Sequence, residues 1–270
     1  METSDVKARY DFAKSLIIVA GELAHGYFRD LSSLNIQSKG LQDVASQADV
    51  ETEQLIRTKI ETSFPADAFF GEETGGIEPE QGQGVWVVDP IDGTSNFVAG
   101  IATWCVSIAF VLNGRIQFGL VYDPVHDELF AAMKGCGATL NDKPITPSAS
   151  NSLRVGRMNM GFSHRSKAEE ITPVIDALIR AGGMYYNAGS GTLGLVHVAC
   201  GRAIGYYEPH INSWDCYGAV AILREAGADV CEAEAGNGLT EGCEIITTVS
   251  GVTKEFSALL AATKNAAPTA

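Results

Sequence analysis

The stretch Trp86–Phe97, WVVDPIDGTSNF, places two aspartates and a proline directly after an apolar run. The run from Val85 to Val88 has the length and the β-branched composition of a buried strand. Asp89 and Asp92 follow within one turn, where two like charges repel each other unless something compensates them. We therefore expect this strand to deliver carboxylates into a site that holds cations.

The residues on the N-terminal side of this strand predict two helices. Apolar residues recur at spacings of three and four between Val6 and Tyr27, which is typical of one long amphipathic helix. A second helix is expected from about Asp49 to Ser63, with Ser46 or Asp49 near its N-cap. Two helices are thus expected to precede any clear strand.

After Val85 the pattern changes to short β-rich runs, and Asn113-Gly114 between two of them is typical of a hairpin turn. These runs predict an antiparallel meander. A stretch rich in Pro, Ser and Asn at residues 141–152 ends it. Strand-like and helix-like segments then alternate up to a final helix from about Val252 to Lys264. The whole pattern indicates a layered α/β architecture with a lobe boundary near residue 150.

Composition limits the classes of partner. The chain of 270 residues is 46% hydrophobic and 19% charged, as in ordinary globular proteins. Its formal net charge of -14 disfavours nucleic acid polymers and anionic membranes as partners. The opening METSDVKARYDF lacks the apolar core of a secretory signal, so we expect a cytoplasmic protein. Six scattered cysteines without a C-x-x-C pair disfavour a zinc site and predict buried thiols.

Acidic residues recur at three places where a predicted strand or loop ends or a helix begins: Glu72-Glu73, the Asp89/Asp92 turn and Asp215. Side chains at such positions point into clefts. Each motif alone also has an ordinary explanation, as a solvated loop, a turn or an N-cap. Together they supply hard oxygen ligands without thiolates or paired histidines, which predicts Mg²⁺, with Mn²⁺ as the alternative.

The turn continues into a predicted helix start at Gly93-Thr94-Ser95. The first amides of a helix have no intrahelical acceptor and attract phosphate. Metal ions and backbone amides would then hold one phosphoryl group from two sides.

Three segments, GEETGG, WVVDPIDGTSNF and EPHINSWDCYGA, resemble the signature segments of the inositol monophosphatase family in the same order. This family comprises lithium-sensitive, Mg²⁺-dependent phosphatases of the same superfamily as fructose-1,6-bisphosphatase. The resemblance extends from about residue 39 to residue 227. It implies an α/β/α/β/α sandwich of the sugar-phosphatase type, two or three Mg²⁺ ions, and a homodimer. Residues 1–150 would form an α+β lobe with most metal ligands, and residues 151–270 an α/β lobe with Asp215 and the substrate pocket.

The resemblance also assigns roles to individual residues. The implied metal ligands are Glu72, Asp89, the Ile91 carbonyl, Asp92 and Asp215. The implied catalytic residues are Asp49, Thr94 and Glu72, with Asp49 and Thr94 orienting the attacking water. The implied substrate-binding residues are Asp92, Gly93, Thr94, Gly189, Ser190, Glu208 and Asp215.

Departures from the family pattern fall on the substrate side. Many members have Arg-x-x-Gly-Ser where this chain has Tyr186-Asn187-Ala188-Gly189-Ser190, so the arginine is missing. Gly194 stands where an acidic or amide residue is common. Glu208 matches the glutamate that the family places against a substrate hydroxyl. The chemistry is therefore expected to be kept, while specificity is open.

The expected reaction is in-line hydrolysis of a phosphate monoester by a metal-activated water, without a covalent enzyme intermediate. Inositol 1-phosphate is the foremost candidate substrate, which would make the chain an inositol-phosphate phosphatase. Histidinol phosphatase, fructose-1,6-bisphosphatase and 3'(2'),5'-bisphosphate nucleotidase are rival activities. A metal-binding or sugar-phosphate-binding protein without catalysis is the rival from another class. Because every implied acidic ligand is present, the enzyme is favoured.

Overall fold

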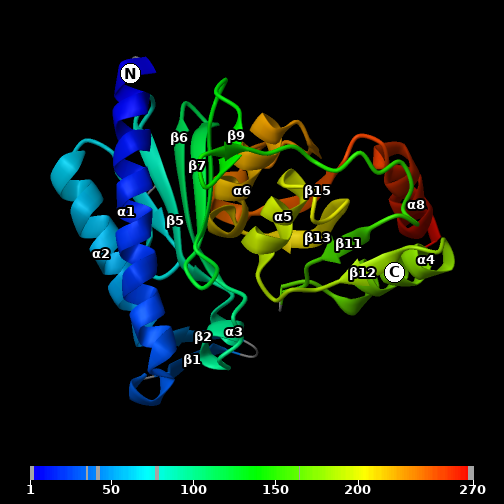
Figure 1. Ribbon diagram of the computed structural model, residues 1–270, viewed down its shortest axis with the longest axis horizontal. Helices are drawn as coiled ribbons and strands as arrows, with labels where there is room; N and C mark the ends of the chain where they lie inside the picture. The colour runs from blue at the N-terminus through cyan, green and yellow to red at the C-terminus, as the bar shows by residue number, and fades with distance from the viewer. Residues whose placement is uncertain (1–2, 35, 41–42, 77–78, 164, 267–270) are drawn as a thin grey trace.

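The computed structural model describes residues 3–34, 36–40, 43–76, 79–163 and 165–266. The helices are α1 (Thr3–Arg29), η1 (Leu31–Ser33, a 3₁₀ turn), α2 (Gln47–Ser63), α3 (Thr94–Val98), α4 (Ala168–Arg180), α5 (Gly191–Ala199), α6 (Ser213–Ala226), α7 (Gly238–Glu241) and α8 (Thr253–Ala266). Five layers follow one another in Figure 1: α1 and α2, a large sheet, α5 and α6, a smaller sheet, and α4 with α8. The expected α/β/α/β/α sandwich is confirmed.

The larger sheet has the strand order β10-β9-β8-β7-β6-β5-β3-β4. Its strands are β3 (Ala68–Gly71), β4 (Gly75–Gly76), β5 (Gly84–Asp92), β6 (Cys105–Leu112), β7 (Arg115–Asp123), β8 (Glu128–Met133), β9 (Ala138–Leu140) and β10 (Lys143–Pro144). Strands β5 to β9 form the expected antiparallel meander, and Asn113 and Gly114 both adopt positive φ in the β6–β7 turn. The parallel partner of β5, strand β3, was not expected from the sequence.

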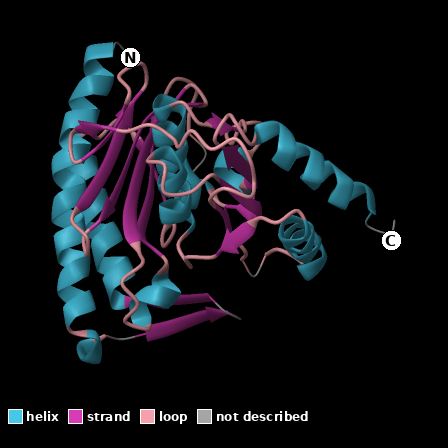
Figure 2. Cartoon of the chain, turned by 45° about the vertical axis from the view of Figure 1, so that its right-hand side comes forward, coloured by secondary structure: helices cyan, strands magenta, loops and turns pink. Residues whose placement is uncertain are grey.

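The smaller sheet has the order β12-β11-β13-β15-β14. Its strands are β11 (Arg157–Met160), β12 (Met184–Tyr186), β13 (Gly205–Ile211), β14 (Asp229–Val230) and β15 (Cys243–Thr248). Helices and strands alternate through this half, as expected. A separate hairpin of β1 (Ile36–Gly40) and β2 (Asp43–Ser46) lies near α3, apart from both sheets, as Figure 2 also shows.

Helix α6 lies between the two sheets and contacts β5, β6, β7 and β8. The approach is close because glycines face each other: a Cβ on Gly119 would lie 2.2 Å from the carbonyl oxygen of Gly218. Every residue of β5 is buried, as the apolar run predicted. The core around β5 therefore fixes the position of α6, whose first turn carries Asp215.

Several smaller expectations have mixed outcomes. Helix α2 begins at Gln47, two residues before the expected start, with Ser46 as its N-cap. Cys105 and Cys216 are buried, but Cys136 is exposed, so the expectation of buried thiols is right only in part. None of the helices in the described ranges combines the length and apolar character needed to cross a bilayer.

Candidate active site

A β-bulge turns Asp89 and Asp92 toward the same site. Asp89 pairs with Ser107 and Asp92 with Cys105, so three steps along β5 oppose two along β6. In a regular strand, residues three apart point to opposite faces, whereas a bulge re-aims one of them. Pro90, which lacks an N–H donor, lies inside the bulge. The Asp-Pro-Ile-Asp sequence is thus the local cause of the paired carboxylates.

Glu72 reaches this site because β3 and β5 are parallel and end at the same sheet edge. Its backbone N–H donates to the Val88 carbonyl over 3.2 Å. The loop is also held from α2, since the buried Glu53 carboxylate accepts hydrogen bonds of 2.9 Å from the amides of Glu73 and Thr74. Sequence reasoning missed Glu53, although it lies one helical turn after Asp49 on the same face of α2.

Asp215 enters from the first turn of α6. Its Oδ2 accepts two hydrogen bonds from Asn212, one from the backbone N–H at 3.3 Å and one from the side-chain amide at 3.0 Å. The residue therefore serves as part of an N-terminal capping box and also faces the acids of β5. Its capping role and its place in the site are compatible.

Asp89, Asp92 and Asp215 offer carboxylate oxygens that all lie within 4.8 Å of one another. Burial raises the pKa of Asp89 well above its usual range, and the charges of Glu72, Asp215 and Asp92 raise it further. No hydrogen-bond donor among the described residues faces Asp89 Oδ2, although this oxygen is buried. Crowded carboxylates with a buried acceptor lacking a donor are what a divalent cation would compensate. This donor set fits Mg²⁺.

Asp92 also contacts the start of α5. Its Oδ2 accepts hydrogen bonds from the Ser190 hydroxyl and, at 2.9 Å, from the Thr192 amide. Burial and the Asp215 charge raise the pKa of Asp92 to about 7, while these donors lower it. Ser190 is also the N-cap of α5 and accepts from the Leu193 amide. The expected substrate residue Ser190 therefore uses its hydroxyl within the protein.

Asp49 and Thr94 form the pair that the resemblance implied. Thr94 Oγ1 lies 3.0 Å from Asp49 Oδ1 and 3.0 Å from the Ile91 carbonyl oxygen. Asp49 Oδ2 accepts from the Ser46 amide at 2.8 Å and from the Ser46 hydroxyl at 2.6 Å. These hydrogen bonds lower the pKa of Asp49, but its complete burial raises it more. Helix α3 begins at Thr94, directly after Gly93, whose φ is 98°.

One cavity of about 560 Å³ gathers most of the expected residues. Those that line it are Glu72, Asp92, Gly93, Thr94, Gly189, Ser190, Glu208 and Asp215. Asp49, Asp89 and Ile91 do not line it and are fully buried. The cavity thus combines carboxylates at one end with a helix start and a polar wall, an arrangement suited to a metal-bound phosphate ester.

Glu208 is nearly buried and accepts a hydrogen bond of 2.6 Å from the Tyr206 hydroxyl. The pKa of Glu208 is raised to about 8, mainly by burial and also by the charges of Asp215 and Asp92, against the lowering effect of the Tyr206 hydrogen bond. Compensation of the charges of Asp215 and Asp92 by bound cations would favour the ionised form of Glu208. The close fit needs Gly161, where a Cβ would lie 2.1 Å from Glu208 Oε2.

Three further residues of the cavity wall, Tyr206, Asn159 and Arg165, were not expected. Tyr206 precedes Glu208 by two positions in β13, and the period of two in a strand places both on one face. That signal was available in the sequence. The Tyr206 ring fits because Gly194 has no side chain: a Cβ on Gly194 would lie 2.6 Å from this ring. Asn159 and Arg165 gave no comparable signal.

Comparison with known proteins agrees with this geometry. The model of the inositol monophosphatase family matches residues 5–267. The chain is 37% identical over 215 residues to Nus factor SuhB of Xylella fastidiosa, covering 79% of this chain and 78% of that one. It is 31% identical over 230 residues to inositol-1-monophosphatase of Mesorhizobium japonicum, covering 84% and 86%.

Solved structures give the same result. SuhB, the extragenic suppressor protein of Bartonella henselae, superposes with a TM-score of 0.87 at 30% identity, covering 94% of this chain and 98% of that one. Inositol monophosphatase from Anabaena gives 0.80 at 30% identity, covering 96% and 97%. The fold and the acidic cluster define a phosphatase of the metal-dependent sandwich class. The chain belongs to the inositol monophosphatase family.

Proposed function

We propose that this protein hydrolyses phosphate monoesters of small polyols, inositol 1-phosphate foremost, in a reaction that depends on Mg²⁺. The observation that carries the proposal is the cluster of Asp89, Asp92 and Asp215 at the end of a cavity that also contains Glu208. The similarity to inositol-1-monophosphatases supports the substrate class. Similar chains also carry the name Nus factor SuhB, so the substrate itself has to be tested.

Two or three Mg²⁺ ions, or Mn²⁺ in their place, would be held by five groups of this chain. They are Glu72, Asp89, the Ile91 carbonyl, Asp92 and Asp215. When bound, such ions supply Lewis acidity and lower the pKa of water. The protein contributes the fixed positions of these oxygens. The bulge in β5, the end of β3 beside the parallel strand β5, and the first turn of α6 set these positions.

Thr94 and Asp49 would orient the attacking water, next to Glu72. The Thr94 hydroxyl has one proton, and donating it to Asp49 Oδ1 leaves an oxygen lone pair that can accept a proton of the water. Asp49 is itself held by two hydrogen bonds from Ser46, so its position does not depend on the substrate. Such positioning lowers the entropy cost of attack.

The substrate would be bound from two sides. The amides that follow Gly93 at the start of α3 would contact its phosphate, and Gly189 and Ser190 would line the opposite wall of the cavity. Glu208 would accept a hydrogen bond from a hydroxyl beside the ester oxygen. This role favours leaving groups that carry hydroxyls, as inositols and sugars do. Because Tyr206 already donates to one Glu208 oxygen, the carboxyl group is held in a fixed orientation.

The test is a panel of initial rates with Mg²⁺ on inositol 1-phosphate, histidinol phosphate, fructose 1,6-bisphosphate and adenosine 3',5'-bisphosphate. The proposal predicts the highest kcat/KM for inositol 1-phosphate. A preference for histidinol phosphate would move the assignment to that activity, and the absence of turnover on all four would favour a binding protein.

We also propose that the protein is a lithium-sensitive homodimer with two lobes, residues 1–150 and 151–270. Family resemblance supports the first two points, and the separate sheets support the third. Helices α5 and α6 contact strands of both sheets, so the lobes would share one core. Sedimentation velocity tests the dimer, and a LiCl titration of the phosphatase rate tests the inhibition.

A further inference from the structure

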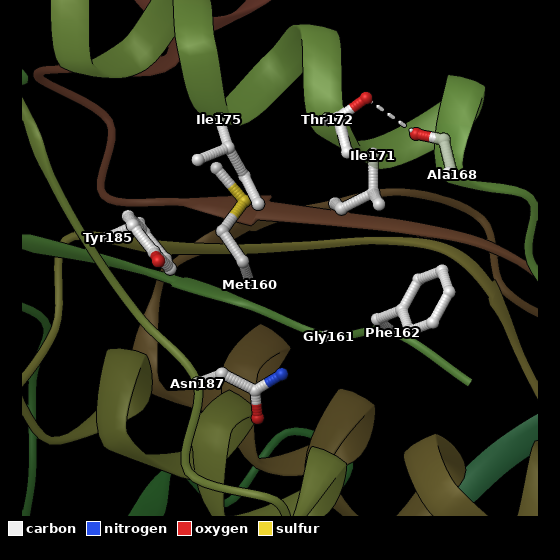
Figure 3. A pocket seen from close by; sticks show the side chains of 9 residues that line it. All are labelled: Met160, Gly161, Phe162, Ala168, Ile171, Thr172, Ile175, Tyr185 and Asn187. Carbon is white, nitrogen blue, oxygen red and sulfur yellow. Dashed lines mark hydrogen bonds between the residues drawn. The ribbon is translucent and has the colours of Figure 1, made fainter.

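An apolar pocket of about 260 Å³ lies between α4 and the end of β11. In Figure 3, Ile171 and Ile175 point from α4 toward Met160, with the rings of Tyr185 and Phe162 at the two ends. Tyr185 is 45% exposed and Phe162 is 50% exposed. Large apolar side chains that remain open around a hollow mark a contact with a ligand or partner.

The polar groups of this pocket are few and mostly engaged within the protein. Thr172 Oγ1 donates to the Ala168 carbonyl at 2.8 Å, which turns it back onto α4 (Figure 3). The side-chain oxygen of Asn187 accepts from the Gly189 amide at 2.8 Å. No charged side chain lines the pocket among the described residues. An uncharged, apolar occupant is therefore favoured, because a polar one would lose hydrogen bonds to water.

The pocket adjoins the catalytic cavity. Met160, Gly161, Phe162 and Asn187 line both hollows. A ligand with its phosphate at the acidic cluster would reach the apolar pocket by passing these shared residues. An inositol ring has no apolar substituent to fill this second hollow.

We propose that the pocket binds an aromatic group carried by the alcohol part of the phosphate ester. This inference rests on the phosphatase function proposed above and extends its substrates to polyol phosphates that carry an aryl group. An aromatic ring suits the walls because Tyr185 and Phe162 offer ring contacts and Met160 offers a polarisable sulfur. A substrate of this kind presents a phosphate, a neighbouring hydroxyl and an aryl group in this order.

Kinetics with a matched pair of esters test the proposal. Glycerol 1-phosphate and its 3-phenoxy derivative share the phosphate and the neighbouring hydroxyl and differ in the aryl group. We expect kcat/KM to be at least roughly tenfold higher for the phenoxy ester, mainly through KM. Tyr185→Ala and Phe162→Ala should each reduce this ratio several-fold. Met184→Ala is the control, since Met184 is 67% exposed on the same strand as Tyr185 but outside the pocket.

Binding can be measured without turnover. With ¹³C-methyl isoleucine labels, 3-phenoxypropane-1,2-diol should shift the signals of Ile171 and Ile175 and leave that of the exposed Ile101 unchanged. These shifts without hydrolysis of either ester would support the pocket and refute only the phosphatase function. Equal kcat/KM for both esters together with unshifted methyl signals would overturn the inference. So would dissociation of a dimer by Tyr185→Ala with an unchanged kcat/KM ratio, because a second copy would then fill the pocket.

Discussion

Asp92→Asn should stabilise the metal-free protein at pH 8 while abolishing most of its activity. In chelator, Asp92 adds a third carboxylate to a buried cluster whose oxygens lie within 4.8 Å of one another. At an effective dielectric constant of about 20, two unit charges at that separation repel by about 3 kcal/mol. Asparagine keeps an acceptor for Ser190 and Thr192, so the substitution removes the charge at nearly constant shape.

The pH dependence has a defined sign. Burial and Asp215 raise the pKa of Asp92 to about 7 from its usual 3.8, so the folded state holds the proton more tightly than the unfolded state. The stability from this proton is present below pH 3.8 and is lost as pH rises to 7. A shift of this size corresponds to at most about 4 kcal/mol. Urea denaturation in EDTA should therefore show equal stabilities at pH 4 and a gain of about 2 to 4 kcal/mol for Asp92→Asn at pH 8.

Asp123→Asn is the matched control. Asp123 is 4% exposed and Asp92 is 6% exposed. Asp123 accepts hydrogen bonds from the amides of Val125 and His126 and from the His126 ring. Asp123→Asn should destabilise the fold, because hydrogen bonds to a charged carboxylate are stronger than hydrogen bonds to a neutral amide. If Asp92→Asn loses as much stability at pH 8 as Asp123→Asn does, Asp92 is an anchor between β5 and α5 and the charge-repulsion reasoning is wrong. Turnover should fall by about two orders of magnitude in Asp92→Asn with Mg²⁺.

Three further outcomes are expected. Glu208→Gln should lower kcat/KM for inositol 1-phosphate roughly tenfold more than for 4-nitrophenyl phosphate, which has no neighbouring hydroxyl; equal losses would assign Glu208 to the fold or the metal site. Thr94→Val should lower kcat by about two orders of magnitude while the protein stays folded, since it removes the hydroxyl held by Asp49; wild-type turnover would exclude a role for that hydroxyl. His197 has a pKa lowered to about 4 by burial and by nearby arginines, so its contribution to stability is full above pH 6.5 and is lost as pH falls toward 4. Thermal melts should show that His197→Gln loses less stability between pH 6.5 and pH 4 than the wild type does, by at most about 3 kcal/mol; an equal loss would assign the acid sensitivity to other groups.

Much of the fold was predictable because its signals are local. The apolar run before Asp89 predicted β5, and Asn113-Gly114 predicted the hairpin between β6 and β7. Strand β3 was missed because Ala68–Gly71 is too short to show a period. It becomes a strand only by pairing with β5, and that pairing places Glu72 in the site.

The same limit applies to the candidate site. The motif strings pointed to the acids and to the Asp49–Thr94 pair, because each motif is contiguous in the chain or belongs to a family pattern. The sequence places Glu53 one turn after Asp49, but not its role as the anchor of the Glu72 loop, since its partner Glu73 lies 20 residues away in the sequence. The apolar pocket beside the cavity could not be predicted from the sequence either, because α4, β11 and β12 meet there only in the folded chain.

The most direct measurement is phosphate release from inositol 1-phosphate by the purified wild-type protein, first in EDTA and then after excess Mg²⁺ is added. A phosphatase whose clustered Asp89, Asp92 and Asp215 hold the catalytic ions should release no phosphate in the chelator and regain full activity with Mg²⁺. Full activity in EDTA would contradict the assignment of the acidic cluster as the catalytic metal site.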